Sequence, residues 1–304
     1  MGRVIIGIHG LGNKPDKRTL KDWWEISMME GLEAAGLKAR LPEFEMVYWA
    51  DIMHKAPLDK NVDNPDSQYY IDEVYKPSPK NFDPAEKKIH KKLLRFLGNQ
   101  INKIFLNEDF TLNYSFIADF IVRKYFQSLE IYYNEECKEK HAGDCKVKEL
   151  IKQRLADVLE KHKNNEIMLV CHSMGSIIAY DVMSFLSPSV KINSFITIGS
   201  PLGLPLIVSK IAAQYKKKEK GKKDMITPPG VYGKWHNFYD VLDRISLNHK
   251  LCARYRANSH GVKPADYEVI NDYHNQEGVH NPHKSYGYLR CREFTTALND
   301  FLKG

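Results

Sequence analysis

The sequence predicts an α/β fold in which helices cover both faces of a mostly parallel central sheet. Short apolar runs typical of buried strands alternate with longer segments whose apolar residues recur every three or four positions, as in amphipathic helices. This alternation favours parallel strands, because each crossover returns the chain to the same end of the sheet. With 304 residues, the chain is long enough for one large domain or for one domain with a sizeable insertion.

The first 50 residues predict the order strand, helix, strand. Residues 4–8 form a short apolar run and are typical of a strand. A helix follows, with a capping-box pattern at Thr19 and with Gly36 suited to end it. Residues 46–49 are a second apolar run and predict the next strand.

The same alternation resumes near residue 147 and continues to the end of the chain. Its apolar periodicity switches between that of helices and that of buried strands. The predicted elements are a helix over 147–159, a strand over 167–170, a helix that Ser173 opens, strands over 192–198, 235–239 and 267–273, and a last helix over 289–301.

Residues 51–146 differ in character and are interpreted as an insertion. They are rich in Lys, Asn, Asp and Tyr, and two stretches, 94–105 and 116–125, have helical apolar spacing. We therefore predict a main domain built from residues 1–50 and 147–304, with a helical cap or lid between them. The two stretches could line an acyl pocket, or they could simply pack within the domain.

The composition is that of an ordinary globular protein, with 43% hydrophobic and 27% charged residues. No apolar run approaches the roughly 18 residues of a membrane span. The N-terminus lacks the apolar core of a signal peptide. Five scattered cysteines favour free thiols in a reducing compartment, so we expect a cytoplasmic protein.

The net charge of +7 comes partly from the basic run Lys216–Lys223. In one interpretation this run is a solvated loop; in the other it attracts an anionic membrane or another acidic partner. The sequence carries no nucleic-acid-binding motif, metal-ligand spacing or phosphate-binding loop. We therefore expect no nucleic-acid partner, no metal and no cofactor.

The strongest chemical signal is Ser173, in the pentapeptide Cys-His-Ser-Met-Gly. A sharp turn from an apolar strand to an apolar helix exposes a serine hydroxyl as a nucleophile, and the helix N-terminus favours a developing anion. The turn needs small residues two positions to either side of the serine, because backbones come close there. Gly175 meets this need, and Cys171 stands where glycine is usual. The adjacent His172 is interpreted as a packing residue.

A second signal is the run His9-Gly10-Leu11-Gly12, which directly follows the first strand. Tetrahedral intermediates of acyl transfer need two backbone N–H donors for their oxyanion. We expect Met174, the residue after the serine, to supply one donor, and Leu11 or Gly10 to supply the other. His9 and Gly10 are expected to border the substrate.

These motifs, together with the Gly-Ser-Pro-Leu-Gly turn over residues 199–203, resemble the lipase and esterase branch of the α/β-hydrolase superfamily. The resemblance covers roughly residues 3–50 and 147–304 and leaves out the insertion. It implies the α/β-hydrolase fold and a catalytic triad in the chain order serine, acid, histidine.

The resemblance also implies where the acid and the base lie. Asp243 occupies the position of the family's aspartate after a strand, and Asp240 remains the alternative. The base is expected shortly before the Ser-Tyr pair that begins the last helix, which points to His283. The other histidines considered are His280, His274 and His260.

The expected activity is hydrolysis of a carboxylic ester, lipid-like or with a small acyl group, through an acyl-enzyme on Ser173. A thioesterase, an acyltransferase or an amidase could use the same residues. A binding module that kept the fold without the chemistry is the remaining alternative, and it would explain both Cys171 and Arg244, which stand where the family has glycine and proline.

Overall fold

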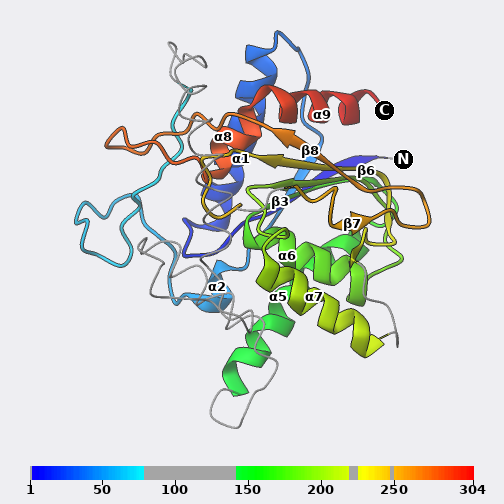
Figure 1. The fold of residues 1–304 in the computed structure, drawn as a ribbon. Coiled ribbons are helices and arrows are strands. Elements are labelled where there is room, and N and C mark those ends of the chain that lie inside the picture. Colours follow the sequence, from blue (N-terminus) through cyan, green and yellow to red (C-terminus); the bar gives the residue numbers. More distant parts are fainter. Residues whose placement is uncertain (1, 79–141, 219–224, 247–249) are drawn as a thin grey trace.

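The computed structural model describes residues 2–78, 142–218, 225–246 and 250–304, and it confirms the predicted α/β architecture (Figure 1). Within these ranges, six parallel strands form a sheet in the order β2-β1-β3-β4-β6-β8. The short strands β5 and β7 pair with each other apart from it. The strands are β1 (Arg3–Ile8), β2 (Glu43–Val47), β3 (Glu166–His172), β4 (Ile192–Ile198), β5 (Met225–Ile226), β6 (Val231–Tyr239), β7 (Tyr255–Arg256) and β8 (Pro264–Glu268).

Helices cover both faces of the sheet. The helices α1, α8 and α9 lie on one face, and α5, α6 and α7 lie on the other (Figure 1). A short π-helical stretch, Val182–Leu186, prolongs α6. The described α-helices are α1 (Lys17–Ala34), α2 (Ala50–Met53), α5 (Ala142–Lys161), α6 (Met174–Asp181), α7 (Pro205–Lys218), α8 (Ser285–Arg290) and α9 (Arg292–Lys303).

Each helical layer packs its own apolar core against the sheet. In β1, Val4 and Ile6 belong to the core on the side of α5 and α6, whereas Ile5 belongs to the core on the side of α1. Successive side chains of a strand point to opposite faces, so a run of apolar residues is expected in a strand that is covered on both sides. This explains why β1 and β3 are apolar throughout most of their length.

The direction of the chain connections reverses between β1 and β3. From β1 the chain passes through α1 to β2 on one side, and it then crosses back through α5 to β3 on the other side. Loops that leave neighbouring parallel strands in opposite directions open a crevice at the carboxyl ends of those strands. The loop after β1 and the turn after β3, which hold the two predicted motifs, meet at this point.

Several predicted boundaries were wrong. The N-cap of α1 is Asp16, whose side chain accepts the backbone N–H groups of Arg18 and Thr19, so Thr19 lies inside the helix. The last sheet strand is Pro264–Glu268 rather than 267–273. The last helix is interrupted at Cys291, where the backbone is extended, and becomes α8 and α9.

The helix α7 was not predicted, and it affects the interpretation of the basic run. Residues 216–218 of the run continue α7 and are not a loop, whereas residues 219–223 lie outside the described residues. The two stretches predicted as a helical cap, 94–105 and 116–125, also lie outside the described residues. None of the described helices combines the length and the apolar character that crossing a bilayer requires.

Candidate active site

Ser173 lies at the sharp turn between β3 and α6, as predicted. Its backbone has φ 52° and ψ −124°, and it is the one non-glycine residue with a positive φ in the described part of the chain. Its N–H donates to the carbonyl of Ile198 at 3.0 Å, which ties the turn to the end of β4. A side chain at positive φ is strained, and such strain persists only where the surroundings over-determine the backbone.

The residues two positions from Ser173 accommodate this turn in different ways. A Cβ atom on Gly175 would lie 2.6 Å from the carbonyl oxygen of Ile8 and 2.8 Å from that of His9, so glycine is required there. Cys171 is fully buried in the core on the side of α6. Burial raises the pKa of its thiol well above the ordinary value, which keeps it a neutral packing group. The tight turn therefore forms without glycine at position 171.

The structure brings the three predicted residues Ser173, His283 and Asp243 together. The Nε2 atom of His283 lies 3.0 Å from the Oγ atom of Ser173. The Nδ1 atom of the same ring lies 2.9 and 3.0 Å from the two carboxylate oxygens of Asp243. An Nδ1–H that donates to the carboxylate leaves Nε2 free to accept the serine proton.

The carboxylate of Asp243 is fully buried and is oriented by several donors. It accepts the hydroxyl of Tyr288 at 2.9 Å and the backbone N–H of Ile245 at 2.9 Å. Burial, together with the charges of Asp243 and Asp240, raises the pKa of Tyr288 well above its ordinary value, so its hydroxyl stays protonated and donates. Tyr288 was missed in the sequence, because a tyrosine inside a helix carries no signal of its hydrogen-bond partner.

Asp240, the alternative acid, has a different role in the structure. Its carboxylate accepts the backbone N–H groups of Leu242 and Asn271 at 2.9 and 2.8 Å. Its own N–H donates to the hydroxyl of Tyr288 at 3.0 Å. Asp240 therefore links the loop after β6 to the loop after β8, and it leaves Asp243 to contact His283.

The alternative histidines lie elsewhere. The Nε2 atom of His280 is 2.6 Å from the carbonyl oxygen of Asn271, and its ring lies beside that of His274 at 5.0 Å. His260 follows β7 and is exposed. His283 is the histidine whose ring lies between the predicted nucleophile and the predicted acid.

The loop after β1 lies directly beside Ser173. A Cβ atom on Gly10 would lie 2.8 Å from the Cβ of Ser173, so only glycine fits there. The backbone N–H of Trp49 donates to Nε2 of His9 at 2.9 Å, which leaves the protonated Nδ1 to donate to the carbonyl of Gly10 at 2.8 Å. In a trans peptide the N–H points opposite to the C=O, so the N–H of Leu11 points away from His9.

The predicted oxyanion donors are the backbone N–H groups of Met174 and Leu11. Met174 is the first residue of α6, so its N–H has no acceptor within the helix. The carbonyl of Leu11 accepts Nζ of Lys14 at 2.5 Å, which holds the chain after Gly10 in a tight loop. His9 is almost fully buried, and both of its ring nitrogens are engaged, so contact between its side chain and a substrate stays a prediction.

Gly199 and Ser200 follow β4, and Gly199 lies against Asp243 and His283. Gly199 has φ 54°, and a Cβ there would lie 2.9 Å from Oδ2 of Asp243 and 3.2 Å from Nδ1 of His283. The hydroxyl of Ser200 lies 2.7 Å from that of Ser176 and accepts the backbone N–H of Leu202 at 3.3 Å. Ser200 is therefore a turn residue, as predicted.

His172 does more than the packing that the sequence suggested. Its Nε2–H donates to the backbone carbonyl of His283 at 2.7 Å, and the two rings lie 4.8 Å apart. Burial, followed by the charge of His283, lowers the pKa of His172 well below its ordinary value, so its ring stays neutral. The residue before Ser173 therefore contacts the loop that carries His283.

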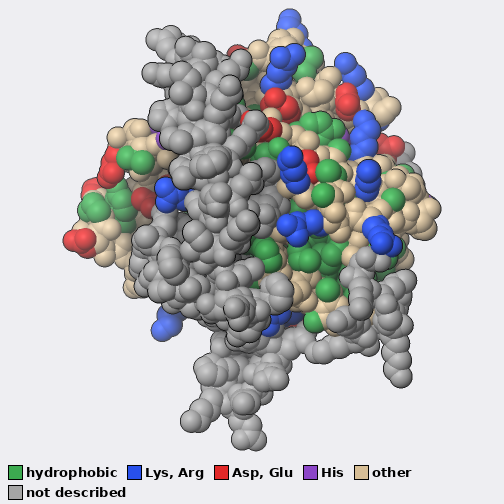
Figure 2. All heavy atoms as spheres, in the orientation of Figure 1, with side chains coloured by type: hydrophobic (Ala, Val, Ile, Leu, Met, Phe, Trp, Pro, Cys, Tyr) green, Lys and Arg blue, Asp and Glu red, His purple; other side chains and the backbone are tan. Residues whose placement is uncertain are grey.

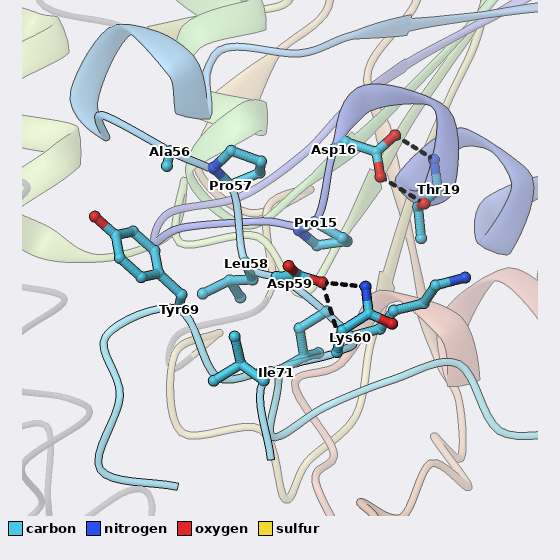
Figure 3. Close-up of a pocket in the computed structure, with 12 residues that line it drawn as sticks. Pro15, Asp16, Thr19, Ala56, Pro57, Leu58, Asp59, Lys60, Tyr69 and Ile71 are labelled. Carbon is cyan, nitrogen blue, oxygen red and sulfur yellow. Dashed lines mark hydrogen bonds between the residues drawn. The ribbon is translucent and has the colours of Figure 1, made fainter. Parts of the chain in front are cut away.

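A hollow of about 410 Å³ lies between the start of α1 and residues 56–71 (Figure 3). Pro15 and Asp16 line one side of it, and Leu58 and Tyr69 line the other. Ser173, Asp243 and His283 do not border this hollow, so it has no direct part in the site.

One group of described side chains could hold a metal ion, and it lies away from the serine. Glu43, Glu45 and His162 bring their ligand atoms within 4.8 Å of one another at the edge strand β2. Glu45 already accepts Nζ of Lys161 at 2.7 Å and contacts Nε2 of His162 at 2.6 Å. This hydrogen-bonded ion cluster accounts for the grouping without an ion.

The charged surface gives no single basic patch in the view of Figure 2. Lysine and arginine side chains are spread over the described part of the face shown there. Contact of the basic run Lys216–Lys223 with an anionic membrane therefore stays a prediction.

Comparisons with known proteins give no independent assignment. No protein-family model matches the chain, and no curated protein matches it significantly.

Proposed function

We propose that this protein is a serine hydrolase of the α/β-hydrolase type that cleaves carboxylic esters. The observation that carries the proposal is the chain of contacts from Oγ of Ser173 through the ring of His283 to the carboxylate of Asp243, at 3.0 Å and 2.9 Å. Hydrogen-bond reach between nucleophile and base, and between base and acid, is the geometric signature of an activated serine. The parallel sheet, whose connections reverse between β1 and β3, is compatible with that family.

In the proposed mechanism, Nε2 of His283 takes the proton of Ser173 as Oγ attacks the ester carbonyl. Asp243 holds the ring in the required tautomer and stabilises the imidazolium that forms. The C–O bond to the alcohol then breaks, and the alcohol leaves with the proton from His283. Water hydrolyses the acyl-enzyme by the same steps, with His283 again as base and then as acid.

The backbone N–H groups of Met174 and Leu11 are the proposed oxyanion donors. The N-terminus of α6 favours negative charge beside Ser173, and Gly10 allows the loop after β1 to approach the serine closely. We propose esters with small or lipid-like acyl groups as substrates.

The test combines a covalent probe with a substrate series. Purified protein is treated with a fluorophosphonate probe and assayed with p-nitrophenyl esters of increasing chain length. Ser173→Ala should abolish labelling and lower ester hydrolysis by about 10⁴-fold or more. Ser209→Ala, which removes an exposed serine hydroxyl on α7, is the matched control and should behave as the wild type.

Two outcomes would overturn the proposal. Full activity in Ser173→Ala would exclude Ser173 as the nucleophile. A folded wild-type protein that neither takes the probe nor hydrolyses any ester would favour a binding module instead.

A further inference from the structure

Residues 71–78 form a strap that lies along the loop carrying His283. The hydroxyl of Tyr273 donates to the carbonyl of Val74 at 2.6 Å. The Nζ atom of Lys76 donates to the carbonyl of Asn275 at 3.0 Å. The strap belongs to the part of the sequence that was interpreted as an insertion, yet it is bonded directly to the main domain.

Glu73 is the residue of the strap that contacts the immediate neighbours of His283. Its Oε2 atom accepts Nζ of Lys284 at 2.7 Å, and its Oε1 atom accepts the side-chain amide of Asn281. Asn281 lies two residues before His283, and Lys284 lies one residue after it. The Glu73 carboxylate therefore binds the chain both before and after His283.

The bond to Asn281 continues to the backbone of His283. The Oδ1 atom of the same amide accepts the N–H of His283 at 3.0 Å. A side-chain amide is planar, so fixing its nitrogen on Glu73 also fixes the direction of its oxygen. Glu73 thus orients the amide of Asn281, and this amide in turn orients the backbone of His283.

The charges around Glu73 favour its ionised form. Burial alone would raise its pKa, but the opposing charge of Lys284 and the hydrogen bonds from Lys284 and Asn281 bring the pKa below the ordinary value. An ionised carboxylate offers only acceptors, which suits two donors that arrive at its two oxygens. A glutamine could satisfy only one of them, because its NH₂ group would face the other.

We propose that Glu73 is a positioning residue that holds the loop of His283 in its reactive geometry from outside the parallel sheet and its helices. The role is that of a support for the base, and it rests on the proposed function of Ser173 and His283. A base displaced by about 1 Å from its nucleophile can lose about 10²-fold in rate, so a support of this kind acts on kcat.

The first experiment compares Glu73→Gln and Glu73→Ala with the wild type in ester hydrolysis and in the rate of fluorophosphonate labelling. The matched control is Tyr75→Phe, which removes the 2.7 Å bond between the strap and Glu30 of α1 without touching residues 281–284. We expect Glu73→Ala to lower kcat and the labelling rate by roughly 10- to 100-fold, with KM changed by less than about twofold. Glu73→Gln should lie between Glu73→Ala and the wild type, and Tyr75→Phe should keep the wild-type kcat.

The second experiment does not depend on activity. The exchange rate of the His283 backbone N–H is measured by NMR in the wild type, Glu73→Ala and Tyr75→Phe. Faster exchange in Glu73→Ala alone supports the proposal even if Ser173 proves unreactive, in which case only the proposed function fails. Unchanged His283 exchange in folded Glu73→Ala, or loss of kcat in Tyr75→Phe equal to that in Glu73→Ala, would overturn it.

Discussion

The proposed nucleophile side of the site, around Ser173, is held by close packing, whereas the proposed base side, around His283, is held by side-chain hydrogen bonds. Around Ser173, a Cβ on Gly10 or Gly175 would lie 2.8 Å or less from its nearest neighbour. Around His283, the supports are the polar groups of Asp243, His172 and other side chains. The first side should therefore be sensitive to added volume, and the second to lost hydrogen bonds.

The proposed function gives this difference a chemical reason. A nucleophile and its oxyanion donors must be fixed before the reaction, and packed backbone achieves this without conformational freedom. The base must accept a proton and donate it again, so its ring needs partners that tolerate a change of charge. Hydrogen bonds from and to side chains provide such partners.

The largest expected effect tests the base side. Asp243→Asn should lower kcat/KM by about 10⁴-fold, because an amide stabilises the wrong tautomer and cannot stabilise the imidazolium. Asp240→Asn is the matched control, because it makes the same substitution at the neighbouring aspartate. It should lower the free energy of unfolding, since Asp240 bonds backbone N–H groups, and it should affect kcat/KM much less. A larger loss of activity in Asp240→Asn than in Asp243→Asn would make Asp240 the partner of the base and Asp243 the structural residue.

Added volume on the nucleophile side should act on folding first. Gly175→Ala puts a methyl group 2.6 Å from the carbonyl oxygen of Ile8, and overpacking of this kind costs about 1–3 kcal/mol. The melting temperature should fall by several degrees, and esterase activity should fall with it as the turn shifts. Gly36→Ala, at a positive φ with open space around it, should cost about 1–2 kcal/mol from its backbone alone and leave kcat unchanged. Equal melting temperatures of the wild type and Gly175→Ala would contradict the packing account.

His172 belongs to the turn at Ser173, but its ring donates a hydrogen bond to the loop of His283. It therefore connects the two sides of the site. His172→Phe keeps a ring of similar shape and removes the donor to the carbonyl of His283. We expect kcat to fall by about tenfold with little change in KM, which corresponds to roughly 1.4 kcal/mol. His172→Gln, which restores a donor, should recover part of the loss. If Phe and Gln give the same kcat, the hydrogen bond has no part in the reaction.

The smallest expected effect is on the pH dependence of stability, and it comes from Lys14. Burial, followed by the charge of Lys284, lowers the pKa of Lys14 from its ordinary value of 10.5 to about 7. Between these values the unfolded chain binds more protons than the folded one, so this group makes stability rise with pH from about 7 to 10.5.

Lys14→Met should remove that contribution. Urea unfolding at pH 7 and at pH near 9.5 should show a smaller increase in the free energy of unfolding for Lys14→Met than for the wild type. Lys17→Met, at an exposed lysine in the first turn of α1, is the control and should keep the wild-type increase. Parallel curves for the wild type and Lys14→Met would show that the lysine stays charged in the fold.

The strands and turns that carry the site could be predicted from the sequence. Most of the side chains that hydrogen-bond to its residues could not. Apolar periodicity identified the strands before Ser173 and Gly199, and the motif at Ser173 identified the turn, because each depends on residues close in sequence. The resemblance supplied Asp243 and His283, which the structure brings to within hydrogen-bond distance of each other.

The supports were missed for a physical reason. Glu73 lies 211 positions from Lys284, and Tyr288 lies 45 positions from Asp243. A hydrogen bond between residues so far apart leaves no local pattern or period in the chain. His172 lies within the motif, but its partner is a backbone carbonyl on another loop, which no side-chain type indicates.

The backbone of Ser173 has a consequence for how this fold can be made more thermostable. With φ 52°, the residue opposes its own conformational preference, and such a position costs of order 1–3 kcal/mol. A glycine would relieve that cost and would leave no hydroxyl to react. Selection for heat resistance alone would thus favour glycine at this position, and the proposed activity would be lost with the hydroxyl. Stabilising changes should therefore be sought away from the carboxyl ends of β1 and β3.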